Sequence, residues 1–453
     1  MPNSATGLSK GETRWNSIED LCDREFGKRP SPANLSTLKR LGSERAEVQE
    51  FVDRVFRLMA IGRLDPADMS PTVAWVLAVL VPGFLPGAWG GTIPPLTFVE
   101  RHRLIDVYVT SNPWMRWEPR DVFLEMGCGF PPQTAVDAAQ NFRDWQVIGA
   151  DPQFDPYVLY DDEGGTYACL DLRGAVRFFN AGDSDMTKYI ALYRDPASTF
   201  RHFEGLFATL VGKLPPEAEC RCATAQQDGA RLIRYPIHNY ERGNLRFIQA
   251  GVGDPSPPAD IVRCFNVLLY FDGDFRRQAE QWALRTVRPG GLFICGVDGA
   301  RTSFARYSVY QNKDGRLVPN EFAFSLDNVR PTTTTYSWSC FYDGEKETWA
   351  LARIVGILRS DPKFCADFDN CLDRLLAEKG IWVRSADGYL AAAANQLATA
   401  NWIPAHEEIE ARLDHEGFVD RAVSILCKAG HRARRNPVGH IAVHPDSVGI
   451  SGA

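Results

Sequence analysis

The stretch from Val122 to Pro132 constrains the fold of this chain more than any other. Val122 to Glu125 form a short apolar run that ends on a carboxylate, and Gly127 and Gly129 follow before a helical run from about Gln133. Glycine adopts left-handed backbone conformations at no steric cost, so such a strand can turn tightly into a helix. The turn directs backbone N–H groups into a crevice beyond the carboxyl end of the strand, where small ligands bind in open α/β sheets.

The overall charge and the cysteines narrow the classes of partner. Acidic residues number 57 and basic residues 50, a formal net charge of −7, so we expect no nucleic-acid partner. The eleven cysteines form no evenly spaced framework, and Cys220-x-Cys222 lacks the second pair that a zinc site needs. We therefore expect no metal, reduced thiols and a cytoplasmic location.

The start of the chain and its most apolar window argue against membrane targeting. Residues 1–30 alternate charged with polar residues, which is unlike a signal peptide. The window Val73 to Trp89 is interrupted by prolines and glycines and is too short to span a bilayer. It predicts a buried helix that ends in a turn at Val81 to Gly83.

Alternating strand and helix patterns between residues 118 and 300 predict a parallel sheet. The expected order is a helix over 135–142, a strand over 145–150, strands over 244–249 and 259–271, a helix over 273–287, and a strand over 292–296. This order predicts an α/β fold with a Rossmann-like, doubly wound and mostly parallel sheet.

The remaining regions are expected to surround this core. Residues 1–117 predict a helical N-terminal region that serves as a packing unit, a lid or a substrate wall. An insertion over about 158–235 is predicted to contain two helices near 184–194 and 197–213, with an exposed acidic loop at Asp161 to Gly165. Residues 301–345 predict a β-hairpin that turns at Asp314-Gly315, and residues 346–453 a helical region with a loose tail.

Four features occur in an order and spacing that resemble the class I S-adenosylmethionine-dependent methyltransferases. They are Glu125 to Gly129, Asp151 at the end of the second strand, Asp260 to Asn266 in the fourth, and Arg288 to Gly291 before the fifth. The run Arg-Cys-Phe-Asn-Val-Leu-Leu-Tyr-Phe within 263–271 is similar to the corresponding strand of chemotaxis-receptor methyltransferases. The resemblance covers about 118–300 without the insertion, and the flanking regions match no subfamily.

This resemblance implies S-adenosyl-L-methionine as the cofactor and a set of residues around it. Gly127 and Gly129 permit close approach of the backbone, Asp151 is expected at the ribose diol, and Glu125 near the methionine ammonium. The resemblance places the turn Gly251-Val252 beside the adenine and Asn266 against the methionine portion. Each residue also has a structural alternative. Glu125 is then a cap of the turn, and Asn266 a hydrogen-bond partner of the neighbouring turn. Asp151 is then a turn residue, and Asp155 binds the ribose in its place.

Methyl transfer from a sulfonium is a one-step displacement, so the protein mainly aligns the reactants and excludes water. If a general base is used, candidates at strand ends and loops are His238, Tyr240, Tyr270 and Asp298. We expect a small-molecule acceptor in a pocket near Asp298-Gly299 and Arg306-Tyr307, with a peptide or protein acceptor as the alternative. The oligomeric state does not follow from the sequence.

Two other classes of function remain open at this stage. One is a methyltransferase-like binding protein that performs no transfer. The other is a nicotinamide-dependent oxidoreductase, which Pro131 and Pro132 disfavour, because such an enzyme normally has a third small residue where Pro132 stands.

Overall fold

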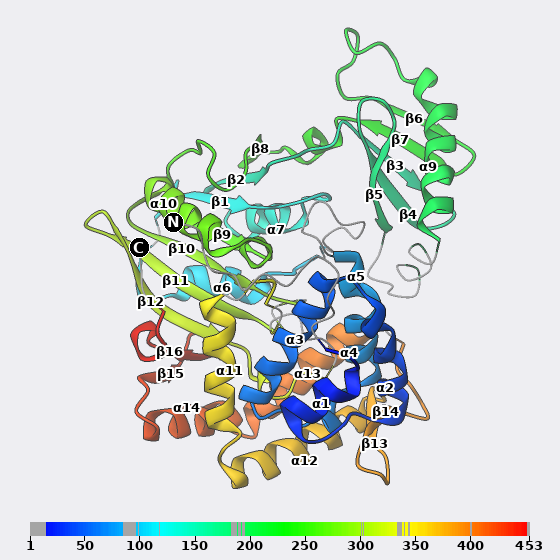
Figure 1. Ribbon diagram of the computed structural model, residues 1–453. Coiled ribbons are helices and arrows are strands. Elements are labelled where there is room, and N and C mark those ends of the chain that lie inside the picture. The colour runs from blue at the N-terminus through cyan, green and yellow to red at the C-terminus, as the bar shows by residue number, and fades with distance from the viewer. Residues whose placement is uncertain are drawn as a thin grey trace, which may run out of the picture.

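The computed structural model describes residues 15–84, 97, 99–116, 118–182, 188, 192, 195–299, 301, 303–332, 338, 340–342, 345–398 and 401–450. A nine-stranded sheet forms the centre of the molecule, and helices cover it (Figure 1). Its strands in spatial order are β15 (Ala433–Arg435), β16 (Ile441–Val443), β12 (Arg316–Phe324), β11 (Arg306–Lys313), β10 (Val287–Val297), β9 (Ala259–Phe265), β1 (Val122–Met126), β2 (Gln146–Asp151) and β8 (Leu245–Gln249).

The five strands β8, β2, β1, β9 and β10 run parallel, which confirms the predicted α/β, doubly wound sheet. The chain moves outward from β1 through β2 to β8, and then crosses back to β9 and β10 on the other side of β1. The strand order therefore reverses between β1 and β9. The antiparallel pair β11 and β12 extends the sheet and turns at Asp314-Gly315, as the sequence predicts.

Side chains of neighbouring strand residues enter two different cores, one on each face of the sheet. Phe123 packs with α6 (Arg103–Ser111) and α7 (Gln133–Asn141), whereas Leu124 packs in the larger core with α10 (Gly273–Thr286) and α11 (Lys346–Leu358). This alternation follows from the two-residue period of a strand. The start of α10 is capped by Asp272, which accepts from the N–H of Phe275 at 2.9 Å. The fourth strand is shorter than expected, because β9 ends at Phe265 and Asn266 adopts φ 59°.

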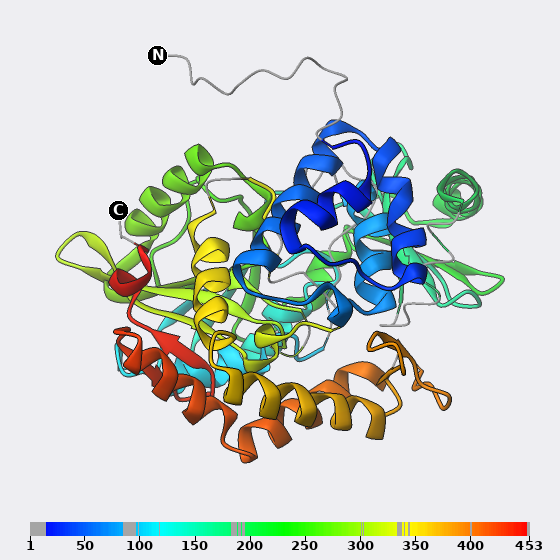
Figure 2. The ribbon, with the colours of Figure 1, turned by 60° about the horizontal axis from the view of Figure 1, so that its bottom comes forward.

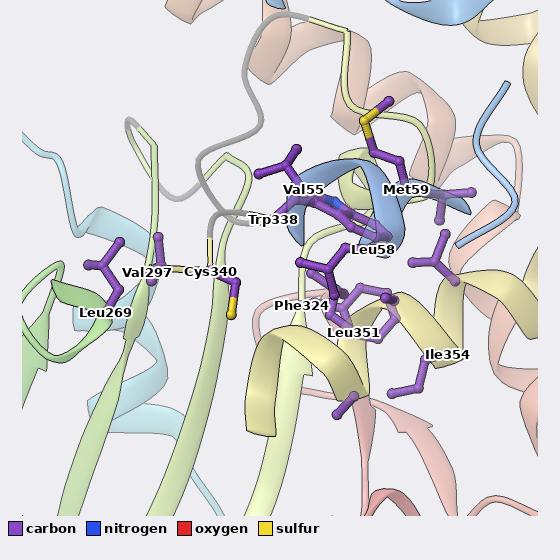
Figure 3. Packing of buried hydrophobic residues seen from close by; sticks show 14 of the residues in the cluster. Val55, Leu58, Met59, Leu269, Val297, Phe324, Trp338, Cys340, Leu351 and Ile354 are labelled. Carbon is purple, nitrogen blue, oxygen red and sulfur yellow. The ribbon is translucent and has the colours of Figure 1, made fainter. Parts of the chain in front are cut away.

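The N-terminal helices pack on the same face as α11. They are α1 (Ile18–Phe26), α2 (Pro32–Leu38), α3 (Ala46–Ile61), α4 (Pro71–Trp75) and α5 (Val81–Phe84), with a π-helical segment over Val76–Leu80. Val55, Leu58 and Met59 of α3 lie close to Trp338 and to Leu351 and Ile354 of α11 (Figure 3). The helix predicted to end at Val81 to Gly83 continues to Phe84, so that prediction was wrong. Within the described ranges, no helix combines the length and apolar character that a bilayer span requires.

The C-terminal region is helical but does not end in a loose tail. Its elements are α12 (Pro362–Glu378), β13 (Trp382–Arg384), β14 (Leu390–Ala392), α13 (Trp402–His415) and α14 (Phe418–Lys428). The three helices lie along one side of the molecule (Figure 2). Beyond them, β16 pairs antiparallel with β12, and Ile441 and Val443 are buried in the larger core. The prediction of a loose tail was wrong because these short strands complete the edge of the sheet.

The insertion between β2 and β8 folds as a second, antiparallel sheet with one long helix, set apart from the main sheet (Figure 1). Its strands in spatial order are β5 (Val176–Ala181), β4 (Thr166–Leu170), β3 (Tyr157–Asp161), β7 (Ala230–Arg234) and β6 (Thr224–Gln227). The helix α9 (Pro196–Leu210) buries Phe203 and Phe207 against one face, within the range predicted for the second helix. The helix expected over 184–194 lies mostly outside the described residues. The acidic stretch expected to be a loop is the turn between β3 and β4.

Candidate functional site

The carboxyl ends of β1, β2, β9 and β10 meet at one edge of the sheet, around the position where the strand order reverses. Ligands of doubly wound sheets bind in the crevice at such a switch point. The glycine turn follows β1, Asp151 ends β2, Asn266 follows β9 and Asp298 follows β10. The fold therefore brings together four features that are spread over more than 170 residues of sequence.

Gly127 and Gly129 both have left-handed backbone conformations, with φ 77° and 63°, but their surroundings differ. A β-carbon on Gly127 would lie 2.4 Å from Cγ2 of Val267, so this position is closed to any side chain. A β-carbon on Gly129 would meet nothing within 4 Å. Gly127 therefore serves the packing of the turn, whereas Gly129 faces open space at the switch point.

Asp151 is buried beside this open space, with 4% of its surface exposed. Its carboxylate accepts from the N–H of Gly129 at 3.0 Å and from that of Gln153 at 3.1 Å. Within the described part of the chain no cation pairs with this carboxylate. Desolvation raises its pKa to about 6, although the two hydrogen bonds act to lower the pKa. Asp155, the alternative ribose partner, lies near Arg177 and accepts from the side-chain amide of Gln153 at 2.8 Å.

Glu125 is buried between the sheet and α6, with 2% of its surface exposed. Its carboxylate accepts from Nε of Arg263 at 2.5 Å, and Arg263 also pairs with Asp106 of α6 and donates to the carbonyl of Thr134 at 3.2 Å. Arg263 is fully buried and lies over the ring of Phe123. Its charge thus holds two carboxylates inside the protein. Contact of Glu125 with a cofactor stays a prediction.

Asn266 and Asp298 bind each other across the ends of β9 and β10. The amide Nδ2 of Asn266 donates to Oδ1 of Asp298 at 2.9 Å, and Oδ1 of Asn266 accepts from the backbone N–H of Asp298 at 3.1 Å. The neighbouring segment therefore supplies partners for the amide, as the structural alternative expected. The second N–H of Nδ2 leaves room for a further acceptor, so contact with the methionine portion also stays a prediction.

Asp298 is also the centre of a charged cluster that the sequence did not indicate. Oδ2 of Asp298 lies 2.7 Å from Nδ1 of His102, and Oδ1 accepts from Nε of Arg101 at 3.2 Å. Burial alone would raise the pKa of Asp298, but His102 and Arg101 outweigh it and lower the pKa below its usual value. Arg101 and His102 stand just before α6, in the region over 1–117 for which the sequence predicted helices but no site residues. A charged pair directly before an amphipathic helix was the one available signal.

The turn Gly251-Val252 lies beside the end of β2, where the resemblance places the adenine. The N–H of Gly251 donates to Oδ2 of Asp254 at 2.7 Å, and a β-carbon on Gly251 would meet Pro152 at 3.3 Å. The backbone of Ala250 donates to the carbonyl of Asp151 at 2.9 Å, which ties the turn to β2. The turn thus closes the site on the side of Asp151.

The three other catalytic candidates lie around this edge without converging on one point. His238 is half-buried and lies 3.0 Å from Glu241 through Nδ1. Tyr240 packs its ring 5.9 Å from that of Phe130, and burial raises its pKa. Tyr270 lies on the other face of the sheet, 5.1 Å from the ring of Phe341.

The insertion contacts the glycine turn through aromatic rings. Phe130, directly after Gly129, packs 6.4 Å from the ring of Tyr167 and 5.9 Å from that of Tyr240. The hydroxyl of Tyr167 donates to the carbonyl of Phe130 at 3.3 Å. One face of the insertion sheet therefore carries aromatic side chains to the edge of the candidate site.

A small charged pocket lies at the end of β10, where the acceptor was expected. Its free volume of about 10 Å³ has room for one water molecule. Its charged walls are Arg276, Arg306, Glu345 and Glu347, with Arg306 paired to Glu345. Tyr307 points to the opposite core beside Tyr108, so it does not line this pocket. No group of three potential metal ligands occurs among the residues that the structure describes.

Comparisons with known proteins give only distant structural likenesses. No protein-family model and no curated protein sequence matches the chain. An O-methyltransferase family protein from Burkholderia thailandensis is similar at a TM-score of 0.23 and 12% identity, over 94% of this chain and 68% of that one. PKMT2 from Rickettsia typhi is similar at a TM-score of 0.20 and 10% identity, over 75% of this chain and 44% of that one. A coclaurine N-methyltransferase bound to N-methylheliamine and SAH is similar at a TM-score of 0.25 and 10% identity, over 94% of this chain and 98% of that one. Scores this low carry no information on substrate or residue roles.

Proposed function

We propose that the protein is an S-adenosylmethionine-dependent methyltransferase. The observation that carries the proposal is the pairing at the switch point. Gly129 is left-handed, borders open space, and donates its N–H to Asp151, a buried carboxylate with no cation beside it among the described residues. A ligand with a hydroxyl-rich, uncharged part and a close approach to the backbone suits this pairing better than a pyrophosphate does.

The residues present fit the cofactor. An ionised Asp151 can accept hydrogen bonds from the ribose diol, and the open side of Gly129 admits a ligand next to the backbone. Gly251 and Val252 would border the adenine, and Asn266 and Glu125 the methionine end. When bound, S-adenosylmethionine would supply an activated methyl group, and the protein would align the acceptor with it and keep water out.

The acceptor is proposed to be a small molecule. The N-terminal helices pack around the larger core, and the insertion brings the aromatic side chain of Tyr167 up to the glycine turn, where Tyr240 from the segment before β8 also packs. Aromatic walls around a site suit a flat or apolar ligand, because they bury a large area in a specific geometry. A peptide acceptor would need a longer open groove.

Titration calorimetry with S-adenosylhomocysteine, S-adenosylmethionine and NAD tests the cofactor. We expect the two adenosyl ligands to bind and NAD not to bind. Binding of NAD without binding of S-adenosylmethionine would contradict the proposal. Transfer of a radiolabelled methyl group to a panel of phenols, amines and peptides then separates an enzyme from a protein that only binds the cofactor.

A further inference from the structure

His102 is held in one orientation beside the candidate site. It forms the N-cap of α6 and is 5% exposed, and its Nδ1 lies 2.7 Å from Oδ2 of Asp298. Asp298 is itself fully buried and is fixed by Arg101 and Asn266. A carboxylate bound to Nδ1 sets which nitrogen of an imidazole carries the proton, and leaves Nε2 as the basic atom.

The second nitrogen of this imidazole has no hydrogen-bond partner among the described residues. Its closest carboxylate oxygen is Oε1 of Glu125 at 3.8 Å, which is too long for a hydrogen bond. The ring packs against Phe265, with the ring centres 5.1 Å apart. A buried imidazole with one nitrogen fixed by a carboxylate and the other without a partner is the arrangement of a general base.

The contacts of His102 place it at one end of the proposed cofactor. It lies next to Glu125 and binds Asp298, which in turn binds Asn266. These are the residues proposed for the methionine end, whereas Gly129 and Asp151 stand at the ribose end. The methyl group is carried on the sulfur between these two parts.

We infer that His102 is the general base of the reaction, that Asp298 is its positioning residue, and that the acceptor is a hydroxyl compound such as a phenol. The inference rests on the proposed function. Nε2 of His102 takes the proton of the acceptor hydroxyl while the acceptor oxygen forms its bond to the methyl carbon. The bond from sulfur to that carbon breaks, and its electron pair stays on the sulfur.

The class of acceptor follows from the presence of a base. A neutral amine attacks through its own lone pair and releases its proton afterwards, and a carboxylate has no proton to lose. A hydroxyl is a poor nucleophile until its proton leaves, so a fixed imidazole suits such an acceptor best.

The inference can be tested without knowing the acceptor, because the two adenosyl ligands differ in charge. S-adenosylmethionine carries a permanent positive charge on sulfur and S-adenosylhomocysteine does not, while both present the same ribose, adenine and amino acid. If Nε2 faces the methyl group, protonation of His102 repels only the sulfonium. The other charged groups around the imidazole are Asp298, Arg101 and Glu125, with Arg263 and Asp106 behind Glu125.

The experiment measures the ratio of the two dissociation constants, Kd for S-adenosylmethionine over Kd for S-adenosylhomocysteine, from pH 8 to pH 5.5. A proton taken up on Nε2 places a positive charge beside the sulfonium, so we expect the ratio to rise about tenfold or more in the native protein. The variant His102→Gln should keep a nearly constant ratio, and His102→Asn is a second variant if the first does not fold. His202→Gln is the matched control, because His202 pairs with Asp161 on the surface of the insertion at 2.9 Å.

The outcomes separate this inference from the proposed function. The role of His102 would be overturned, while both ligands still bind, by either of two results. One is a ratio of the dissociation constants that stays constant with pH in the native protein. The other is the same pH dependence of this ratio in a folded His102 variant as in the native protein. Failure of both ligands to bind at every pH would overturn the proposed function and the inference with it. If the ratio of the two dissociation constants changes with pH in the native protein and in His202→Gln but not in the His102 variants, the result supports both the inference and the proposed function.

Discussion

Two buried aspartates at the same edge of the sheet have opposite electrostatic surroundings. Asp151 has two backbone N–H donors, and desolvation raises its pKa to about 6. Asp298 is buried more deeply, yet its pKa is lowered, because His102 and Arg101 outweigh the desolvation that would raise it. Burial alone therefore does not decide the pKa of a carboxylate here, and the polar groups that face it do.

This difference divides the candidate site into two halves. In the half around Asp151 and Gly129, open space lies beside a carboxylate that pairs with no cation of the described chain, which suits neutral hydroxyl groups. In the half around Asp298, Glu125 and His102, opposite charges pair inside the protein, which suits the charged end of a ligand. Four predictions test the division, and they follow in order of decreasing expected effect.

The half of the site around Asp298, Glu125 and His102, called the charged half below, depends on Arg263 for its stability. Replacing Arg263 with Met leaves Glu125 and Asp106 buried without their cation, so we expect the free energy of unfolding to fall by roughly 3–5 kcal/mol. Urea denaturation measures this change. Arg277→Met is the control, since Arg277 pairs with Asp274 on the surface and such pairs contribute about 0–1 kcal/mol. Equal losses in the two variants would contradict the account.

The two glycines of the turn should respond differently to alanine. Gly127→Ala combines a left-handed backbone with a clash against Val267 and should lower the free energy of unfolding by roughly 2–4 kcal/mol. Gly129→Ala has no clash, so only the backbone cost of roughly 1–2 kcal/mol applies, while binding of S-adenosylhomocysteine should weaken.

Gly315→Ala is the control for this pair, because Gly315 is equally left-handed and open but lies in the β11–β12 turn. It should match Gly129→Ala in stability and leave binding unchanged. If Gly129→Ala binds S-adenosylhomocysteine as tightly as the native protein does, the open space beside Gly129 is not part of the cofactor site.

The carboxylate of Asp151 should contribute directly to binding. We expect Asp151→Ala to weaken binding of S-adenosylhomocysteine by roughly 1–3 kcal/mol, the loss of a charge-assisted hydrogen bond, as measured by calorimetry. Asp155→Ala is the matched variant, since Asp155 is the alternative partner of the ribose. Unchanged affinity in Asp151→Ala together with a loss in Asp155→Ala would move the ribose role to Asp155.

The raised pKa of Asp151 predicts a pH dependence of binding. The ligand favours the ionised carboxylate, so affinity for S-adenosylhomocysteine should be full above pH 7 and fall as the pH drops through about 6, up to about tenfold at pH 5. Asp151→Asn cannot titrate at this position and should show a weaker and flatter pH profile. An identical decline in Asp151→Asn would assign the effect to another group.

The same pKa shift has a consequence for stability. Because the pKa of Asp151 is higher in the folded protein than in the unfolded chain, its contribution favours folding below about pH 4 and is lost as the pH rises from about 4 to about 6. Bound cofactor should offset this loss above pH 6.

The sequence was sufficient for much of the parallel core, because β1, β2 and β10 are apolar runs that end at a glycine or an aspartate. The positions of the glycine turn and Asp151 at one edge also followed from that pattern. The insertion was harder to predict, since strands such as β7 mix apolar with polar residues, and the five strands of the insertion form a sheet separate from the main one. The C-terminal strands are three residues long, which is too short for any periodic pattern.

The charged half of the site could not be predicted for a different reason. His102 and Asp298 are 196 residues apart in sequence, and Arg263 and Glu125 are 138 apart. Nothing local marks such partners, because buried ion pairs form only when the sheet brings the segments together. The same applies to Asn266, whose left-handed backbone ends β9 at Phe265, six residues before the apolar run ends at Phe271.

The insertion enters and leaves the main domain at a single point, since Tyr235 donates its backbone N–H to the carbonyl of Pro156 at 2.6 Å and Tyr157 pairs with Arg234. Residues 157–234 thus form a detachable module. A short turn in their place should keep β2 paired with β8 while it removes the contact of Tyr167 with Phe130 and that of Arg177 with Gln153 and Asp155. Modules joined in this way can be exchanged or resized without altering the register of the host sheet, so acceptor preference could be re-engineered here independently of the cofactor site.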